Sequence, residues 1–523
     1  MTGFNVFGWD VKTEYTKTLA EYVEKMRYED IPAEVLERFK IFLTHAIGCA
    51  LAASKMKSTE IAVTVAKEIG SSGDATCWVT GEKMTTSAAC FANGAALDML
   101  DWEDCAYTGH PLYGIIPPAI AIGEQKKASG KELLTAMVAA FEAYQRIALC
   151  VGDPGKIPHP KFGHGLPNWS IFGATAAAAK LYELSADQIN QAFGATAMIH
   201  PINSSGVQAT MSEAYHLEAG YIAQGGLWAA LCAREGIDNM RDAFDIPYMF
   251  SEQLTKDPQF HWLNKELGSR YMLMEMLLKH WPANMWVQNP IEAAWLINKE
   301  HNLDTDQIKE IIVDPPMEFR MHHRPEGYTS VLDAEFSTPY GVAIVLLHPV
   351  PGADWYTKEM FKDPKVLELA AKVKAGPSAA LSLLGSFDVY ASSNGTDFPT
   401  RTVTIEMNEN INIFVGENDS GKSTILEALS MVLTGKINGS SVANRLNLDW
   451  FNAQVRQKFK ESIEAGNTPD LPTIEIEVYF ASPDEDEIAI KKYRGTNNSL
   501  HEDAEGVKLE IIFDTQYAPA YKH

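Results

Sequence analysis

The sequence predicts a multidomain protein: a large all-α domain over residues 1–275, a smaller α+β domain over 276–402, and a partial α/β lobe over 403–523. A chain of 523 residues is too long for one hydrophobic core, so several domains are expected. The pattern changes twice, from helical to mixed near residue 290, and then to a phosphate-binding loop, GENDSGKST, at 416–424. These observations carry the three-part prediction.

The first part is predicted to be helical throughout. It begins with EYTKTLAEYVEKM and IPAEVLERFKIFLTHAIGCALAAS, and Pro32 fits the first turn of the second helix. Ala-rich segments at 170–184 and 214–236 place small residues at helical spacing, which allows close helix packing. The most apolar segment, 132–152, contains Glu142 and Arg146, and this favours a buried helix over a membrane span.

The second part mixes helices and strands. NPIEAAWLINKEHNL predicts a helix, QIKEIIVDPP predicts a strand that stops at paired prolines, and FPTRTVTIEM predicts another strand. The stretch LSLLGSFDVYASSNGTDFP before that strand has the composition of a linker. We therefore place the next domain boundary shortly after it, at 402–403.

Charge and composition limit the possible functions. The formal net charge of −24 argues against a general nucleic-acid surface, because phosphate binding needs a basic face. The six cysteines form no CxxC pair, so no thiolate metal centre is predicted. The first residues lack a basic region followed by an apolar core, so we expect a cytoplasmic protein without a membrane partner.

The candidate active site begins at NGAALDMLDWEDCAYTGHP, residues 93–111, where four carboxylates precede His110. On spacing alone, a solvated acidic helix end is the alternative. The stretch resembles the LDFDDT…HP pattern of the MmgE/PrpD family, which includes 2-methylcitrate dehydratase, cis-aconitate decarboxylase and iminodisuccinate epimerase. Similar segments follow in order: HGLPNWSIFGATAAAAKLYELS from 164, AGYIAQGGLWAALCAREG from 219, LLKHWPAN from 277, EFSTPYGVA from 335 and FPTRTVTI from 398. The resemblance covers about 10–407.

The resemblance implies a catalytic pocket made of Asp101, His110, His164, Lys279 and Tyr340. Their types suit the chemistry, because removing a proton beside a carboxylate builds up negative charge that a Lys or His stabilises. Tyr340 or a histidine would protonate a departing hydroxyl, and Asp101 would orient an imidazole or ammonium. No cofactor or metal is expected for this half.

Several positions depart from the family pattern. Cys105 stands where a threonine is common, Glu213 replaces a lysine in SEAYH, and Asn284 replaces a histidine. Two potential cations are lost, so an altered substrate is expected, with Cys105 and Asn284 lining its site. RMHHRPEGY, with Arg320 and Arg324, is either a replacement anion clamp, in which Arg324 binds substrate, or a basic surface loop.

The leading hypothesis is a cofactor-independent lyase acting on a small di- or tricarboxylate of the 2-methylcitrate type, with dehydration favoured over decarboxylation. An epimerase of the same family is the nearest alternative, because it needs only two opposed acid–base groups. A nucleotide-binding regulatory or defence ATPase with a non-catalytic helical scaffold is the alternative from another class. We also expect a homo-oligomer, a dimer, and no nucleic acid bound by the enzyme half.

The third part contains a phosphate-binding loop in strand–loop–helix context, INIFV-GENDSGKST-ILEALSMVL. The glycines permit a turn that points backbone N–H groups at phosphates, Lys422 reaches the outer phosphates, and Ser423 ligates Mg²⁺. ATP and Mg²⁺ are therefore the predicted ligands. The predicted nucleotide contacts are Gly416, Asn418, Ser420, Gly421, Lys422, Ser423 and Thr424.

This part resembles, over about 403–523, the N-terminal lobe of P-loop ATPases related to the OLD nucleases and the RecF/SMC group. The second acidic pair that such ATPases use for hydrolysis is not recognisable: Asp514 follows an apolar run, but an ordinary sheet strand is favoured there. We expect nucleotide binding without fast hydrolysis. We interpret the chain as a junction of two truncated genes in which the terminal helical return of the MmgE/PrpD fold is missing.

Overall fold

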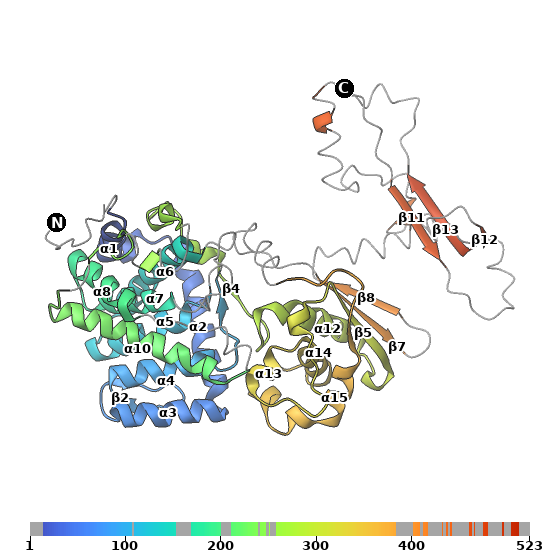
Figure 1. Ribbon diagram of the computed structural model, residues 1–523, viewed down its shortest axis with the longest axis horizontal. Helices are drawn as coiled ribbons and strands as arrows, with labels where there is room; N and C mark the ends of the chain where they lie inside the picture. The colour runs from blue at the N-terminus through green and yellow to red at the C-terminus, as the bar shows by residue number, and fades with distance from the viewer. Residues whose placement is uncertain are drawn as a thin grey trace. The chain divides into compact units, whose positions relative to one another are not determined.

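The computed structural model describes residues 14–106, 109–152, 169–199, 211–238, 241–246, 250–251, 258–382 and 401–407, and short segments between 412 and 511 (Figure 1). The chain divides into two compact units, Met1–Glu417 and Asn418–His523. The candidate site lies in the first.

Helices dominate the N-terminal part of the first unit. They are α1 (Tyr15–Lys25), α2 (Ala33–Ala52), α3 (Lys57–Gly70), α4 (Thr86–Asp98), α5 (Leu112–Lys126), α6 (Gly130–Gly152), α7 (Ser170–Leu181), α8 (Ala186–Ile199) and α10 (Ala214–Arg234). Two short antiparallel pairs interrupt the helical pattern, β1 (Ala75–Thr76) with β2 (Lys83–Met84), and β3 (Asp104–Cys105) with β4 (Leu277–Leu278). The second pair is central to the site.

Helix α6 is a core helix. By length and composition Gly130–Val151 could cross a membrane, but 94% of its most apolar window is buried inside the protein. Its two buried charges neutralise one another, because Arg146 Nη1 lies 2.6 Å from Glu142 Oε2 and both side chains are fully buried. The remaining guanidinium donors of Arg146 bind backbone carbonyls, among them that of Lys265. This arrangement agrees with the buried helix predicted from the sequence.

Glycines set the distance between α4 and α10. A Cβ added to Gly94 would lie 2.8 Å from the Ala219 carbonyl oxygen, and one added to Gly220 would lie 2.5 Å from the Phe91 carbonyl oxygen. Only glycine allows such close approach of two backbones. The contact brings the start of α10 next to the end of α4.

The following part of the first unit is an α+β layer. Its sheet has the order β6-β5-β7-β8, with β5 (Ile308–Asp314) parallel to β6 (Val373–Ala375) and antiparallel to β7 (Thr402–Met407), which pairs antiparallel with β8 (Asn412–Gly416). Its helices are α12 (Gln288–His301), α13 (Val331–Glu335), α14 (Thr338–Leu347) and α15 (Pro364–Ala371). Helices α12 and α14 pack against the sheet (Figure 1). Residues such as Ile311, Val403 and Ile405 form a second core with them.

Short 3₁₀ turns connect these elements: η1 (Tyr28–Asp30), η2 (Ala53–Lys55), η4 (Phe260–Leu263), η5 (Met272–Glu275), η6 (Met285–Val287), η7 (Thr305–Gln307), η8 (Glu318–Arg320), η9 (Ala353–Tyr356) and η10 (Met360–Lys362). In the second unit, β9 (Lys436–Ile437) pairs with β10 (Ser440–Ser441). A second antiparallel sheet there has the order β11-β13-β12, formed by Ile474–Tyr479, Ala504–Ile511 and Arg494–Gly495.

The close packing of α4 and α10 predicts the effect of Gly220→Ala. Because the new Cβ would meet the Phe91 carbonyl oxygen as well as the Phe91 ring, we expect the free energy of unfolding to fall by about 1–3 kcal/mol. Urea unfolding followed by tryptophan fluorescence measures this. Gly48→Ala is the control, because this exposed position in α2 has no atom within 4 Å of an added Cβ. It should be neutral or stabilising by up to about 1 kcal/mol; equal stability of the Gly220→Ala and wild-type chains would contradict the close contact.

Candidate active site

The acidic turn after α4 is buried. Asp98, Asp101, Glu103 and Asp104 are each at most 3% exposed, so the alternative of a solvated acidic helix end is wrong. Asp101 has a φ of 44°, and its N–H donates to the Asp98 carbonyl oxygen at 2.9 Å. This left-handed residue turns the chain sharply, so that the carboxylates of the turn lie close together.

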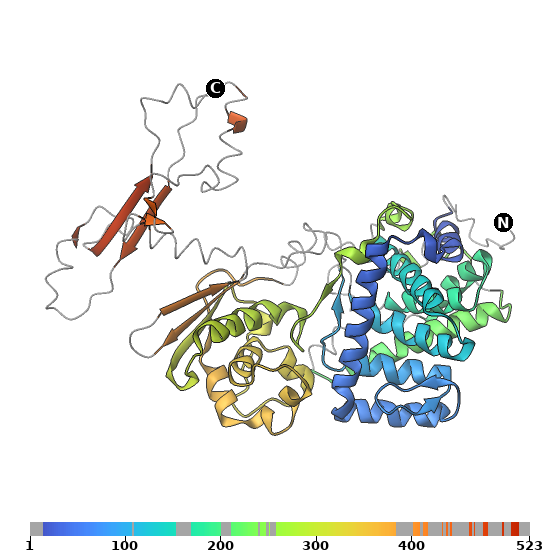
Figure 2. The same cartoon turned by 180° about the vertical axis from the view of Figure 1, so that it is seen from behind.

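The pairing of β3 with β4 brings Lys279 to this turn. Asp104 lies opposite Leu278, and the Lys279 N–H donates to the Glu103 carbonyl oxygen at 3.2 Å. Helix α2 braces both segments, because Arg38 donates to the Met276 carbonyl and the His45 ring contacts the Trp102 carbonyl; Figure 2 shows α2 beside β4. A position 178 residues from Asp101 thereby enters the site.

The ammonium of Lys279 is surrounded by oxygen. It donates to the Asp101 carbonyl oxygen at 2.8 Å, to Glu103 Oε1 at 2.8 Å and to the Asp101 carboxylate. These contacts engage all three of its N–H donors. Burial alone would lower the pKa of Lys279, but the two carboxylates outweigh burial and raise it, so the ammonium stays charged.

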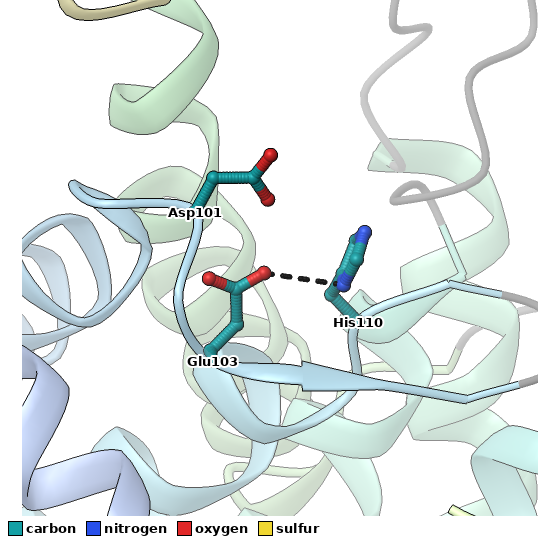
Figure 3. A group of neighbouring side chains, drawn as sticks. All are labelled: Asp101, Glu103 and His110. Atoms are coloured by element: carbon teal, nitrogen blue, oxygen red, sulfur yellow. Dashed lines mark ion pairs between the residues drawn. The ribbon is translucent and has the colours of Figure 1, made fainter. Parts of the chain in front are cut away.

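The imidazole of His110 is oriented through one nitrogen. Its Nδ1 lies 2.6 Å from the Asp104 carbonyl oxygen and 3.1 Å from Glu103 Oε1 (Figure 3). A carbonyl oxygen can only accept, so Nδ1 carries the proton and Nε2 presents a lone pair. Burial and the nearby Lys279 ammonium lower the pKa of His110, which keeps the ring neutral.

The carboxyl groups around Lys279 differ in protonation. Burial raises the pKa of Glu103 well above its usual value and that of Asp104 to about 8. Burial also acts to raise the pKa of Asp101, but the Lys279 ammonium and His110 outweigh burial, so the pKa of Asp101 is lowered. The pKa values of Asp101 and Glu103, which share the Lys279 ammonium, are therefore shifted in opposite directions.

A second histidine, His216 of α10, lies between carboxylates of the helical and α+β parts. Its Nδ1 is 3.2 Å from Asp98 Oδ2, and its Nε2 is 2.9 Å from Glu335 Oε1. Burial lowers its pKa, but these two carboxylates overcome burial and raise it well above the usual value. Sequence reasoning missed His216, although it is the histidine retained at the end of SEAYH. The preceding Tyr215 also borders the cluster, where burial and Asp101 raise its pKa.

Asn284 connects the acidic turn to Arg320. Its Nδ2 donates to Asp101 Oδ2 at 3.3 Å, and its Oδ1 accepts from Arg320 Nε at 3.0 Å. Cys105 borders the site in a small apolar cluster with Met285 and Trp286. Asp101, His110, Lys279, Cys105 and Asn284 are thus brought together.

Other residues predicted from the sequence lie elsewhere. Tyr340 is fully buried in the second core, where its hydroxyl donates to the Trp355 carbonyl and its ring packs on Tyr328, so its position does not support a role as catalytic acid. The side chain of Arg324 is 43% exposed, and its Nη2 pairs with Asp333 Oδ1 at 2.9 Å rather than with a carboxylate of the acidic turn. Tyr340 is therefore a residue of the second core, and Arg324 forms an ion pair with Asp333.

His164 and loop residues Asn418, Ser420, Gly421, Lys422, Ser423 and Thr424 lie outside the described residues, as does Asp514. Gly416 ends β8, where it pairs with Thr402 of β7. Their predicted roles stay predictions.

Three of the clustered groups also have the geometry of metal ligands. The ligand atoms of Asp101, Glu103 and His110 lie within 4.8 Å of one another. The Lys279 ammonium is bound to two of these three groups, so it already supplies the cation that the carboxylates need. An added divalent ion would have to displace it against like-charge repulsion.

Comparison with known proteins identifies the domains. Residues 17–263 match the MmgE/PrpD N-terminal domain, residues 281–408 match the MmgE/PrpD C-terminal domain, and residues 396–516 match an AAA domain. Asp101, Glu103 and His110 lie in the first range, Asn284 and Arg320 lie in the second, and Lys279 lies between the two. The multidomain organisation predicted from the sequence is therefore confirmed, while the predicted boundaries at 275 and 402 stay predictions.

Curated relatives are similar at low identity. The chain is 27% identical over 265 residues to the cis-aconitate decarboxylase-like protein oryM of Aspergillus oryzae, covering 47% of this chain and 53% of that protein. It is 24% identical over 312 residues to the cis-aconitate decarboxylase of Aspergillus terreus, covering 54% of this chain and 60% of that protein. The chain thus spans a little over half the length of these relatives. Together with the two matched domains, this shows that the chain belongs to the MmgE/PrpD family and carries an additional AAA domain.

Proposed function

We propose that this chain is a cofactor-independent lyase that acts on a small di- or tricarboxylate, with dehydration favoured over decarboxylation. The observation that carries the proposal is the buried pair of His110 and Glu103, whose Nδ1 and Oε1 lie 3.1 Å apart. In this proposal His110 is the base and a protonated Glu103 is the acid. A base and an acid in one buried site can remove a proton from carbon and protonate a leaving hydroxyl.

The proton positions follow from the contacts. His110 Nδ1 is bound to acceptors, so Nε2 is the basic atom that takes the proton beside the substrate carboxylate. Glu103 Oε1 faces both Lys279 and His110, whereas Oε2 has no hydrogen-bond partner among the described residues. The acid proton of Glu103 therefore resides on Oε2, from which it can pass to a leaving group.

Lys279 contributes through the electrostatic effect of its positive charge rather than through a hydrogen bond to the substrate. Its donors are already used by Asp101 and Glu103, but its positive charge keeps His110 neutral and stabilises negative charge that develops on the substrate. Asp101 holds the ammonium in place. In a buried site this effect is stronger than in water.

Two alternatives within the family remain. The names of the similar Aspergillus proteins favour decarboxylation, which needs a proton donor for the carbanion but no base to start the reaction. An epimerase would use the same two groups and no leaving group. A neutral histidine held ready as a base favours the reactions that begin with proton removal.

We also propose that the loop at 416–424 binds ATP with Mg²⁺, consistent with the AAA match over 396–516. A regulatory or defence ATPase with a non-catalytic helical scaffold is the alternative function. Turnover of a carboxylate by the full chain decides between the two. A homodimer and a cytoplasmic location stay proposals, the former open to analytical ultracentrifugation.

We predict that His110→Gln lowers turnover at least about 100-fold, because the general base is removed. The measurement is proton NMR in deuterated water with a panel of di- and tricarboxylates, which distinguishes water loss, carbon dioxide loss and α-proton exchange. His280→Gln is the control, because this neighbour of Lys279 is exposed and pairs with Glu292. Unchanged turnover in His110→Gln, with the melting temperature retained, would remove His110 from the mechanism.

The pH profile should show His110 as a base of lowered pKa. Only neutral His110 accepts a proton, so kcat/KM should be at its plateau near neutral pH and fall as the pH drops through a midpoint below 6.5. The profile of the purified chain measures this midpoint. An acid limb centred above 6.5 would mean that the carboxylates, not burial and Lys279, control the ring.

For the phosphate-binding loop, we expect Mg²⁺-dependent ATP binding with slow or absent hydrolysis. Fluorescent ATP titration and phosphate release on the full chain measure both quantities. Lys422→Ala should abolish binding, because this lysine is expected to reach the outer phosphates, whereas Lys436→Ala, a lysine in strand β9, should bind normally. Fast hydrolysis lost in Lys422→Ala would instead favour the ATPase alternative.

A further inference from the structure

Arg320 is a cation buried at the edge of the acid–base cluster. It ends the 3₁₀ turn η8 after β5 and is 5% exposed. Its guanidinium carbon lies 4.2 Å from the Phe336 ring centroid and 4.7 Å from that of Phe319. The planar group is thus held between apolar surfaces and has lost most of its water.

The hydrogen bonding of Arg320 is incomplete. Nε donates to Asn284 Oδ1 at 3.0 Å, but within the described parts of the chain Nη1 and Nη2 have no acceptor, and no carboxylate lies within ion-pair distance. The buried Arg146 provides the contrast, because its Nε, Nη1 and Nη2 all have oxygen partners. A buried guanidinium with an open fork is a site that favours an anion.

The other cations of the site are already neutralised. Lys279 has Asp101 and Glu103, and His216 has Asp98 and Glu335. Of these three site cations, Arg320 is therefore the one without a carboxylate partner among the described residues. Asn284 fixes it relative to Asp101, the residue that holds Lys279.

We propose that Arg320 is the specificity-determining residue that binds one substrate carboxylate in a bidentate contact, with Asn284 as its positioning residue. This inference rests on the proposed function and deepens it. Burial lowers the pKa of Arg320 to about 10, so the group is still charged at neutral pH. The fork presents parallel N–H donors that match the two oxygens of a carboxylate.

The charge balance narrows the substrate class. The buried carboxyl groups of Asp98, Asp101, Glu103, Asp104 and Glu335 surround a site with one free cation in its described part. Each further substrate carboxylate would face these acids without a partner, so a dicarboxylate should bind better than a tricarboxylate. An anchored carboxylate would also fix the orientation of the carbon next to it relative to the acid–base pair.

The test measures binding separately from turnover. Calorimetric titration of the full chain with succinate, citrate and uncharged succinamide gives affinities for wild type, Arg320→Gln and Arg324→Gln. We expect succinate to bind more tightly than citrate, succinamide not to bind, and Arg320→Gln to weaken succinate binding by about 10- to 100-fold. Arg324→Gln, four residues away and paired with Asp333 outside the site, should bind as wild type does.

Asn284→Asp is a second test that remains informative if Arg320→Gln fails to fold. It keeps Arg320 but places a carboxylate 3.0 Å from Nε, so it should weaken succinate binding as an internal competitor. Succinate binding unchanged in both variants would overturn the inference, and if His110→Gln still lost turnover the proposed lyase would stand. Succinate binding that depends on Arg320 in a chain that turns over no carboxylate would support the anchor and refute the lyase.

Discussion

The buried ammonium of Lys279 is the interaction on which the site depends. A charge taken out of water needs opposite charge and a complete set of hydrogen bonds. Asp101 and the Glu103 carboxyl supply both, and the β3–β4 pair holds the lysine segment against the acidic turn. The ammonium therefore ties together two segments that are distant in sequence, and the remaining groups of the cluster are arranged around it.

The positive charge of Lys279 also shifts the pKa values of the neighbouring titratable groups. It lowers the pKa of Asp101 against the effect of burial and adds to burial in lowering that of His110, while burial raises the pKa of Glu103 well above its usual value. In the proposed mechanism, this difference allows a base and an acid to lie a few ångströms apart. His216 differs from His110, because Asp98 and Glu335 overcome burial and raise its pKa well above the usual value.

The sequence could predict the elements with long patterns and the residues that a family motif marks. Helix α6 and strands β5 and β7 follow from hydrophobic periodicity, and Lys279 was placed from LLKHWPAN. The two-residue strands β3 and β4 have no period to detect, and their pairing is a tertiary contact. Tyr340 was assigned to the pocket from the motif alone, although TPYGVAIVLL is apolar on every face, which is typical of a core helix. His216 of α10 and Asp98 of α4 lie close together because glycines let these two helices approach closely.

The departures from the family pattern have unequal consequences. Glu213 is the residue immediately before α10, and its carboxylate accepts a hydrogen bond from Ser58 of α3, so it joins these two helices. Asn284 instead stands between the ionised Asp101 and the buried Arg320, and its amide donates to the first and accepts from the second. A protonated imidazole at this position has only donors and could not accept from a guanidinium. The neutral amide is therefore what allows a second buried cation to sit next to the Lys279 cluster.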